Sequence, residues 1–311
     1  MNKHSNILVV GHNDAVENSL VQYFRANKYV RVFSSSLLKL ELLSQKKVLS
    51  FFDNKKIDYV FLGSIRSGGI AANQRFAAEF IYENLESQNN VIHAAYQSGV
   101  KKLLYFMSSC AYPKECGQPI KEEYLLTASL EETSEPYSVA KIAGVKLCQT
   151  YKKQYGFDAI VAAPATIYGP GSDTNLETAH VMGALIGKFH QAVREGQKEV
   201  VVWGSGRARR EFLFTEDFVA ACVFLMEHYS EPRLINVGCG DDVSIKELAL
   251  IIKEVSGFKG KIVFDRTKPD GAMKKLLDNC RITKLGWKAK VGLKEGIGKT
   301  YRRYSEKQED V

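Results

Sequence analysis

The chain has 311 residues, of which 45% are hydrophobic and 25% are charged, an ordinary globular composition. It contains no apolar run long enough to span a membrane, and its polar first residues lack the apolar stretch of a secretory signal. The 43 basic and 35 acidic residues give a charge of +8 that is spread along the chain. We therefore expect a cytoplasmic protein without a membrane or nucleic-acid partner, although the basic balance suits a small anionic substrate.

Six cysteines are scattered through the sequence, and no two have the C-x-x-C spacing of zinc or redox sites. This spacing predicts no metal site. For most of the six, the simplest interpretation is a free thiol in a reducing compartment. Cys110 is the exception, because it lies two residues after a candidate catalytic serine.

The first half of the chain alternates short apolar strands with longer amphipathic helices. We predict strands at 6–10, 30–33, 58–62, 102–106 and 159–163, and helices at 14–27, 70–99 and 136–155. Apolar strands without alternation are typical of a parallel sheet that is covered on both faces. The order strand, helix, strand therefore predicts an α/β fold, a Rossmann-like doubly wound parallel sheet, in residues 1–170.

Beyond residue 170 the pattern is looser. It predicts helices at 178–195 and 244–256, a strand at 200–203 and a basic helix from Leu293 onward. We assign residues 171–311 mainly to a smaller α/β domain that binds the substrate. Some of its segments are expected to return to the first sheet.

The strongest chemical signal is the pair Tyr137 and Lys141, which a separation of four residues places on one face of a helix. A nearby ammonium stabilises a phenolate, so the pair can exchange a proton with a carbonyl oxygen. The pair follows a predicted strand that leads into Ser108, and a side chain at the carboxyl end of a parallel strand points into the ligand crevice. Ser108, Tyr137 and Lys141 together resemble the catalytic triad of the short-chain dehydrogenases/reductases.

Five blocks of sequence extend this resemblance over almost the whole chain. They are SSCAYP at 108–113, EPYSVAKIAG at 135–144, WGSG at 203–206, REFL at 210–213 and KPDGAMKKLLD at 268–278. In this order they are similar to the blocks of the GDP-L-fucose synthases, a family of the extended short-chain dehydrogenase/reductase superfamily. Several adjoining blocks of this kind are far more specific than one motif.

The resemblance implies an NADPH-dependent epimerase-reductase that acts on a GDP-4-keto-6-deoxy-hexose. In that family the C4 ketone acidifies the protons at C3 and C5, a base and an acid exchange those protons, and hydride then reduces C4. The family's base and acid match Cys110 and His180, whose thiolate and imidazole suit proton transfer. Tyr137 would protonate the C4 oxygen, Lys141 would tune the phenol, and Ser108 would hydrogen-bond the same oxygen.

The resemblance also implies the binding residues and the assembly. The substrate nucleotide would be bound by Trp203, Arg210 and Lys275, because basic side chains suit a pyrophosphate. The NADPH site would be formed by Gly11, Asn13, Val16, Tyr137, Lys141, Pro164 and His180. Apart from the resemblance, Arg66 could serve the adenosine phosphate. Similar enzymes are commonly homodimers, so we expect a homodimer through the apolar faces of residues 76–99 and 138–155.

Three departures from the family pattern affect these expectations. Asp14 and Glu17 replace two glycines of the G-x-x-G-x-x-G turn, adding charge and bulk where backbone amides should approach a pyrophosphate; only Gly11 remains. The second strand is followed neither by the acid of NAD enzymes nor by the Arg of NADP enzymes. Ala165 also stands within a Pro-Ala-Thr sequence where the family has Pro-Thr-Asn, which could signal a different sugar.

These departures leave alternatives to NADPH-dependent epimerisation and reduction. The cofactor could be NADH, or there could be none. The enzyme could retain only the epimerase or only the C4 reductase half of the chemistry. A catalytically silent nucleotide-sugar-binding or regulatory subunit is a third interpretation, which the retention of all five catalytic residues opposes.

Overall fold

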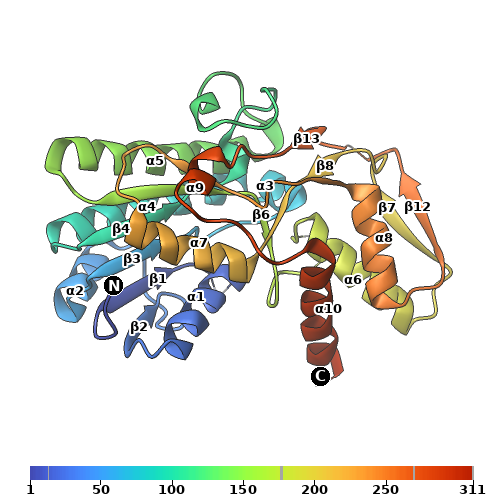
Figure 1. The fold of residues 1–311 in the computed structure, drawn as a ribbon, viewed down its shortest axis with the longest axis horizontal. Helices are drawn as coiled ribbons and strands as arrows, with labels where there is room; N and C mark the ends of the chain where they lie inside the picture. Colours follow the sequence, from blue (N-terminus) through green and yellow to red (C-terminus); the bar gives the residue numbers. More distant parts are fainter. Residues whose placement is uncertain (13, 176–177, 269, 310–311) are drawn as a thin grey trace.

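The core of the molecule is a parallel sheet of six strands (Figure 1). The computed structural model describes residues 1–12, 14–175, 178–268 and 270–309. Across the sheet the strands are β10 (Ile235–Val237), β5 (Ala159–Pro164), β4 (Lys102–Phe106), β3 (Tyr59–Leu62), β1 (Asn6–Val10) and β2 (Arg31–Ser34). The strand order reverses beside β1, which confirms the predicted doubly wound fold. Sheets of this kind bind ligands at the carboxyl ends of the strands beside that reversal.

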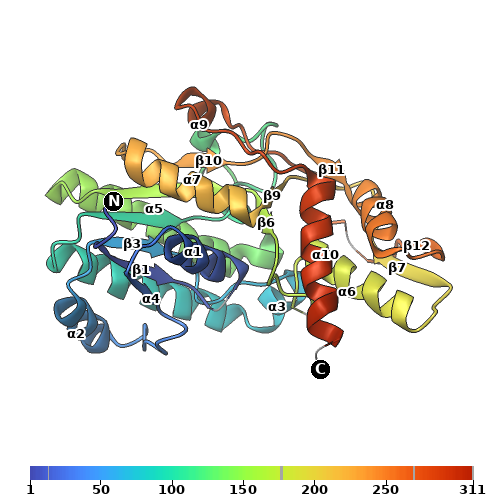
Figure 2. The ribbon, with the colours of Figure 1, turned by 60° about the horizontal axis from the view of Figure 1, so that its bottom comes forward.

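Helices cover both faces of this sheet (Figures 1 and 2). On one face α1 (Ala15–Ala26) lies beside α7 (Thr215–His228), and on the other α4 (Ala77–Gln97) lies between α2 (Gln45–Lys55) and α5 (Glu135–Tyr155). The sequence analysis did not predict α2 and α7. Because α7 and β10 come from the second half of the chain, that half does contribute to the sheet. None of the described helices is both long and apolar enough to cross a bilayer.

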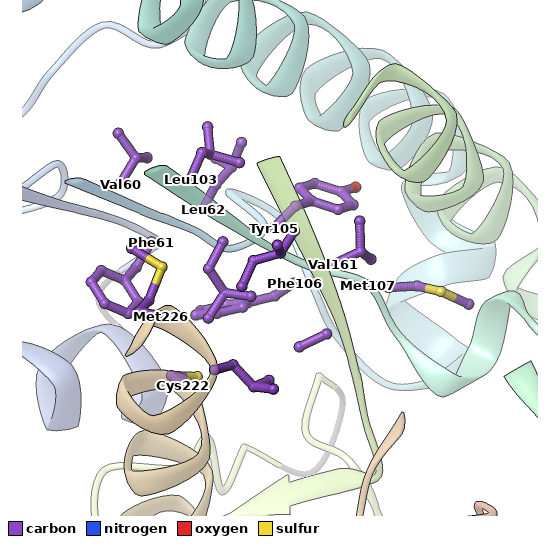
Figure 3. Packing of buried hydrophobic residues seen from close by; sticks show 14 of the residues in the cluster. Val60, Phe61, Leu62, Leu103, Tyr105, Phe106, Met107, Val161, Cys222 and Met226 are labelled. Carbon is purple, nitrogen blue, oxygen red and sulfur yellow. The ribbon is translucent and has the colours of Figure 1, made fainter. Parts of the chain in front are cut away.

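The interior of the sheet explains why its strands read as continuous apolar runs. Every residue of β4 and β5 is buried, because helices cover both faces. Figure 3 shows Phe61 directed toward Cys222 and Met226 of α7, whereas Leu103 and Tyr105 point away from that helix. Full burial of one such apolar side chain contributes about 1.5–3 kcal/mol to the free energy of unfolding.

A second hydrophobic core lies at the far end of the molecule from β2 and α2 (Figure 1). It is built by α6 (Val181–Arg194), β7 (Glu199–Trp203), α8 (Ile245–Ser256), β12 (Lys261–Asp265) and α10 (Leu293–Glu309). Short elements link the two cores: β6 (Thr166–Tyr168), β8 (Arg209–Arg210), β9 (Phe212–Phe214), β11 (Val243–Ser244), β13 (Lys274–Lys275) and α9 (Cys280–Lys284). The basic helix expected from Leu293 is α10. The division at residues 170 and 171 stays a prediction.

The single long helix expected at 70–99 is wrong, because the chain forms α3 (Ile70–Arg75) and then α4. Between them Phe76 has φ −121° and ψ 36°, outside the helical region. Gly69, just before α3, donates its backbone N–H to the carbonyl of Thr178 at 2.8 Å. A Cβ at Gly69 would lie 2.6 Å from the carbonyl oxygen of Ala179, so only glycine allows this approach. The contact ties α3 to the segment before α6 rather than to the axis of α4.

Candidate active site

A cavity of about 490 Å³ opens where β1, β3, β4 and β5 end. Residues that follow each of these strands line it. Gly11, Ser64, Ser108, Cys110 and Pro164 line it at or just beyond the strand ends. Tyr137 of α5 and His180, the N-cap of α6, line it as well. Strands of one parallel sheet end at one edge, so distant parts of the sequence converge on one cavity.

Helix α5 brings Tyr137 to the cavity and places Lys141 one turn deeper. Gly144 lets the helix approach β4 closely, because a side chain there would collide with the ring of Tyr105. Lys141 is buried, and its Nζ lies 4.5 Å from the ring centre of Tyr105 and 5.9 Å from that of Tyr137. Tyr137 and Lys141 therefore lie on one face of the helix, as expected.

Burial favours the neutral forms of the Tyr137 phenol and the Lys141 amine. It raises the pKa of the Tyr137 phenol and lowers the pKa of the Lys141 ammonium to about 7. Hydrogen bonds from Ser64 and Ser108 oppose the shift of Tyr137 by lowering its pKa. At neutral pH the phenol therefore keeps its proton, which is the state that an acid needs before it protonates a carbonyl oxygen.

Cys110 and His180 face the same cavity from different elements. Cys110 lies in the short 3-10 helix η1 (Ser109–Ala111), and its backbone N–H donates to the Ser108 hydroxyl at 3.2 Å. His180 is the N-cap residue of α6. Loss of hydration lowers the pKa of His180, although the Asp173 carboxylate raises it. A lowered pKa makes the protonated imidazole a stronger proton donor.

The three residues expected to bind the nucleotide lie outside the lining of this cavity. Arg210 and Lys275 are direct partners in the pairing of β8 with β13, and Lys275 Nζ reaches to 4.0 Å from Cys110 Sγ. Trp203 ends β7 and is 55% exposed. Its ring lies 5.4 Å from Lys188 Nζ and 5.3 Å from Lys268 Nζ. An aromatic ring with two lysine ammonium groups nearby suits a ligand that stacks on the ring and carries negative charge.

The glycine-poor turn after β1 is filled by its acidic substitutes. Asp14 caps α1, accepting the backbone N–H of Glu17 at 2.8 Å. Glu17 is buried, and its carboxylate accepts bonds from the Ser34 hydroxyl at 2.7 Å and the Ser36 N–H at 3.2 Å. A Cβ at Gly11 would lie 2.8 Å from the Cβ of Glu17, so the retained glycine accommodates this side chain.

The other expected cofactor residues have different environments. Gly11, Val16 and Pro164 line the cavity, while Asn13 lies outside the described residues. Arg66 does not line it. Its guanidinium instead forms a two-pronged ion pair with Glu83, at 2.6 and 3.0 Å, so the expectation of a phosphate contact from Arg66 finds no support in this geometry.

A second, open hollow of about 630 Å³ adjoins the first and shares Gly11 and His12 with it. Apolar and polar residues that follow β2 line it, among them Ser36, Lys39 and Leu42. The two hollows together run from the end of β2 to Tyr137. This path has the position expected for an extended dinucleotide in a doubly wound sheet. The buried Glu17 side chain lies along this path, in the lining of the first cavity.

Sequence reasoning missed Ser64 and His12. Ser64 follows β3 and its hydroxyl lies 3.0 Å from the Tyr137 phenol oxygen. The signal that identified Ser108, a serine just beyond a parallel strand, was also present at Ser64. Among the described residues no cluster of acidic, histidine or cysteine side chains could hold a metal ion.

Comparison with known proteins agrees with this architecture. Residues 7–238 match the model of the NAD dependent epimerase/dehydratase family. The chain is 47% identical to GDP-L-fucose synthase 1 of Arabidopsis thaliana, over 97% of this chain and 94% of that protein. The chain belongs to the NAD dependent epimerase/dehydratase family, and within it to the GDP-L-fucose synthases and their relatives.

Two solved structures from Campylobacter jejuni share the fold of this family member. A GDP-6-OMe-4-keto-L-xylo-heptose reductase superposes with a TM-score of 0.92 at 34% identity, covering 99% of both chains. A GDP-mannoheptose C4 reductase with NADP bound superposes with a TM-score of 0.89 at 36% identity, covering 98% of this chain and 99% of that one. The likeness therefore extends over both cores.

Proposed function

We propose that this protein is an NADPH-dependent epimerase-reductase that acts on a GDP-4-keto-6-deoxy-hexose. The observation that carries the proposal is the convergence of Ser108, Cys110, Tyr137 and His180 on one cavity beside Gly11. A reductase needs only the serine, the tyrosine and the buried lysine. The additional thiol and imidazole supply the base and acid that epimerisation needs.

The reduction half uses the triad. When bound, NADPH supplies the hydride that reduces the C4 ketone. Tyr137 gives its phenol proton to the C4 oxygen, and Ser108 donates a hydrogen bond to the same oxygen. In its protonated form, Lys141 places positive charge behind the tyrosine ring, which stabilises the phenolate that remains. The NADP bound in the solved C4 reductase supports this choice of cofactor.

The epimerisation half uses groups from two elements. Cys110 takes a proton from the carbon next to the ketone, and His180 returns one from its imidazolium. Lys275, 4.0 Å from the sulfur, can stabilise a thiolate by charge attraction. In our proposal Arg210 and Lys275 also hold the pyrophosphate, and Trp203 stacks on the base.

Replacing Cys110 with serine should separate the two halves of the reaction. A hydroxyl is a far weaker carbon base than a thiolate, so incorporation of solvent deuterium at C3 and C5 should fall about 100-fold. NADPH oxidation should persist, because the triad is intact. Nuclear magnetic resonance of the product in deuterium oxide measures the first quantity, and absorbance of NADPH the second.

Cys116→Ser is the matched control, because this cysteine lies in the same loop region and its thiol donates to the carbonyl of Pro113 at 3.7 Å. It should leave deuterium incorporation unchanged. Equal deuterium incorporation by wild type and Cys110→Ser would contradict the role of Cys110.

We further propose a cytoplasmic homodimer that associates through α4 and α5. These helices pack side by side on one face of the sheet and expose Tyr82, Val139 and Tyr155, at 62%, 39% and 48%. All six cysteines are free thiols, which suits a reducing compartment.

Light scattering should give about twice the chain mass of 34.8 kDa. In the Tyr82→Asp/Val139→Asp variant it should fall to one chain mass, and a monomeric wild type would overturn the assembly.

A further inference from the structure

The hydroxyl of Ser64 lies 3.0 Å from the phenol oxygen of Tyr137. Ser64 follows β3, two residues beyond Leu62, and lines the same cavity as the tyrosine. We propose that Ser64 is a positioning residue for the proton transfer: its hydroxyl donates to the Tyr137 oxygen, directs the phenol proton toward the substrate and stabilises the phenolate left behind. Ser64 thus acts through Tyr137 and adds a fourth member to the triad.

The structure fixes both partners of this contact. The backbone carbonyl of Ser64 accepts a hydrogen bond from Nδ1 of His12 at 3.0 Å, which ties the end of β3 to the end of β1. His12 is itself held by the Ser67 hydroxyl, 3.2 Å from its Nε2. On the other side, the Phe80 ring packs edge-on against the ring of Tyr137 at 6.1 Å between centres. These contacts hold the Ser64 hydroxyl and the Tyr137 phenol within hydrogen-bond distance of each other.

The chemistry of the phenol oxygen determines which of the two groups donates the hydrogen bond between Ser64 and Tyr137. A phenol can donate one hydrogen bond and accept others, whereas a phenolate can only accept. When the Tyr137 O–H bond breaks, its proton forms a new O–H bond at the C4 oxygen and its electron pair stays on the tyrosine. Ser64 must then be the donor, and its bond to the charged oxygen becomes shorter and stronger. This stabilises the product side of the transfer more than the reactant side.

The direction of the pKa shift of Tyr137 supports this role. Burial raises that pKa, and the hydrogen bond with Ser64 is the largest influence that lowers it. Three further influences come from groups around the phenol. The bond with Ser108 lowers the pKa, whereas the charges of Cys110 and Asp14 raise it. Ser64 is therefore the group whose removal should move the ionisation of Tyr137 most.

The inference rests on the proposed function, but its first test needs no turnover. We would place 2,3,5-trifluorotyrosine, which ionises at lower pH than tyrosine, at position 137 and follow its ionisation by fluorine magnetic resonance. Ser64→Ala should move the midpoint to about tenfold lower proton concentration, since a bond to a charged oxygen is lost. Ser98→Ala, which removes an exposed hydroxyl that bonds Asp53 far from the cavity lining, should not move it. An unchanged midpoint in Ser64→Ala, or an equal shift in both variants, would overturn the inference.

A second measurement uses the unlabelled enzyme. Ser64→Ala should lower kcat about tenfold with KM within a factor of two, because the lost bond strengthens only as the proton leaves. Ser64→Thr, which retains the hydroxyl, should recover most of the rate. If the protein has no activity on any GDP-keto-sugar, the proposed function fails while the fluorine titration still decides the role of Ser64.

Discussion

Replacing Tyr137 with phenylalanine should lower kcat by about 1,000-fold and leave the fold intact. The phenol is the group that protonates the C4 oxygen, and positioned acid catalysis contributes about 10²–10⁴-fold. Only an oxygen is removed from a ring that remains packed against Phe80. NADPH oxidation in the presence of the keto-sugar measures the loss, and thermal unfolding checks the fold.

Tyr151→Phe is the matched control for this change. Tyr151 lies on the same helix, and its hydroxyl bonds Nδ1 of His93 at 2.8 Å, away from the cavity lining. It should keep kcat within about a factor of two, because surface hydrogen bonds contribute little. A Tyr137→Phe enzyme with a turnover within tenfold of wild type would refute the assignment of the acid.

Replacing Glu17 with glutamine should tighten NADPH binding at least about tenfold. The Glu17 carboxylate is buried beside Ser34 and Ser36, where a doubly wound NADP enzyme places the 2′-phosphate of its cofactor. Two like charges about 4 Å apart repel by about 4 kcal/mol at an effective dielectric of about 20, and about a third of that repulsion already weakens binding tenfold. Glutamine has the same shape and keeps an acceptor for the Ser34 hydroxyl. Reduced-nicotinamide fluorescence measures the dissociation constants of NADPH and NADH.

The ratio of the dissociation constants of NADPH and NADH isolates the effect of the Glu17 charge on the 2′-phosphate. NADH lacks the 2′-phosphate, so its affinity for Glu17→Gln should change by less than about threefold. Glu41→Gln removes a carboxylate that lines the adjoining hollow, pairs with Lys47 and faces solvent. Because solvent screens that charge, the ratio should stay as in wild type. An unchanged ratio in Glu17→Gln would show that the buried carboxylate does not face the phosphate.

The sheet was predictable because its signal is local and redundant. Five apolar runs of strand length alternate with amphipathic stretches, and β4 has the bounds that were predicted. The contribution of β10 and α7 could not be placed in the same way, since their position depends on contacts with β5 and α1 that are distant in the sequence. Propensity also cannot locate the break at Phe76, which follows from the tie between Gly69 and Thr178.

The residues of the candidate site also differ in how far the sequence could predict them. Tyr137 and Lys141 were predictable as a pair because helical spacing alone puts them on one face. Cys110 and His180 came only from the family resemblance, and the structure places both on the cavity. The ion pair of Arg66 with Glu83 was not predictable, because Glu83 lies on α4, well beyond Arg66 in the sequence. The environment of Glu17 was equally hidden, since its carboxylate bonds Ser34 at the end of β2 and the next two serines, Ser35 and Ser36.

In the function proposed here, one cavity epimerises and then reduces its substrate. We would incubate the wild-type protein with GDP-4-keto-6-deoxy-D-mannose and NADPH in deuterium oxide and determine the product by nuclear magnetic resonance. We expect one NADPH consumed per product, deuterium at C3 and C5, and hydrogen from the cofactor at C4. Recovery of the substrate without deuterium and without loss of NADPH would contradict the proposed function.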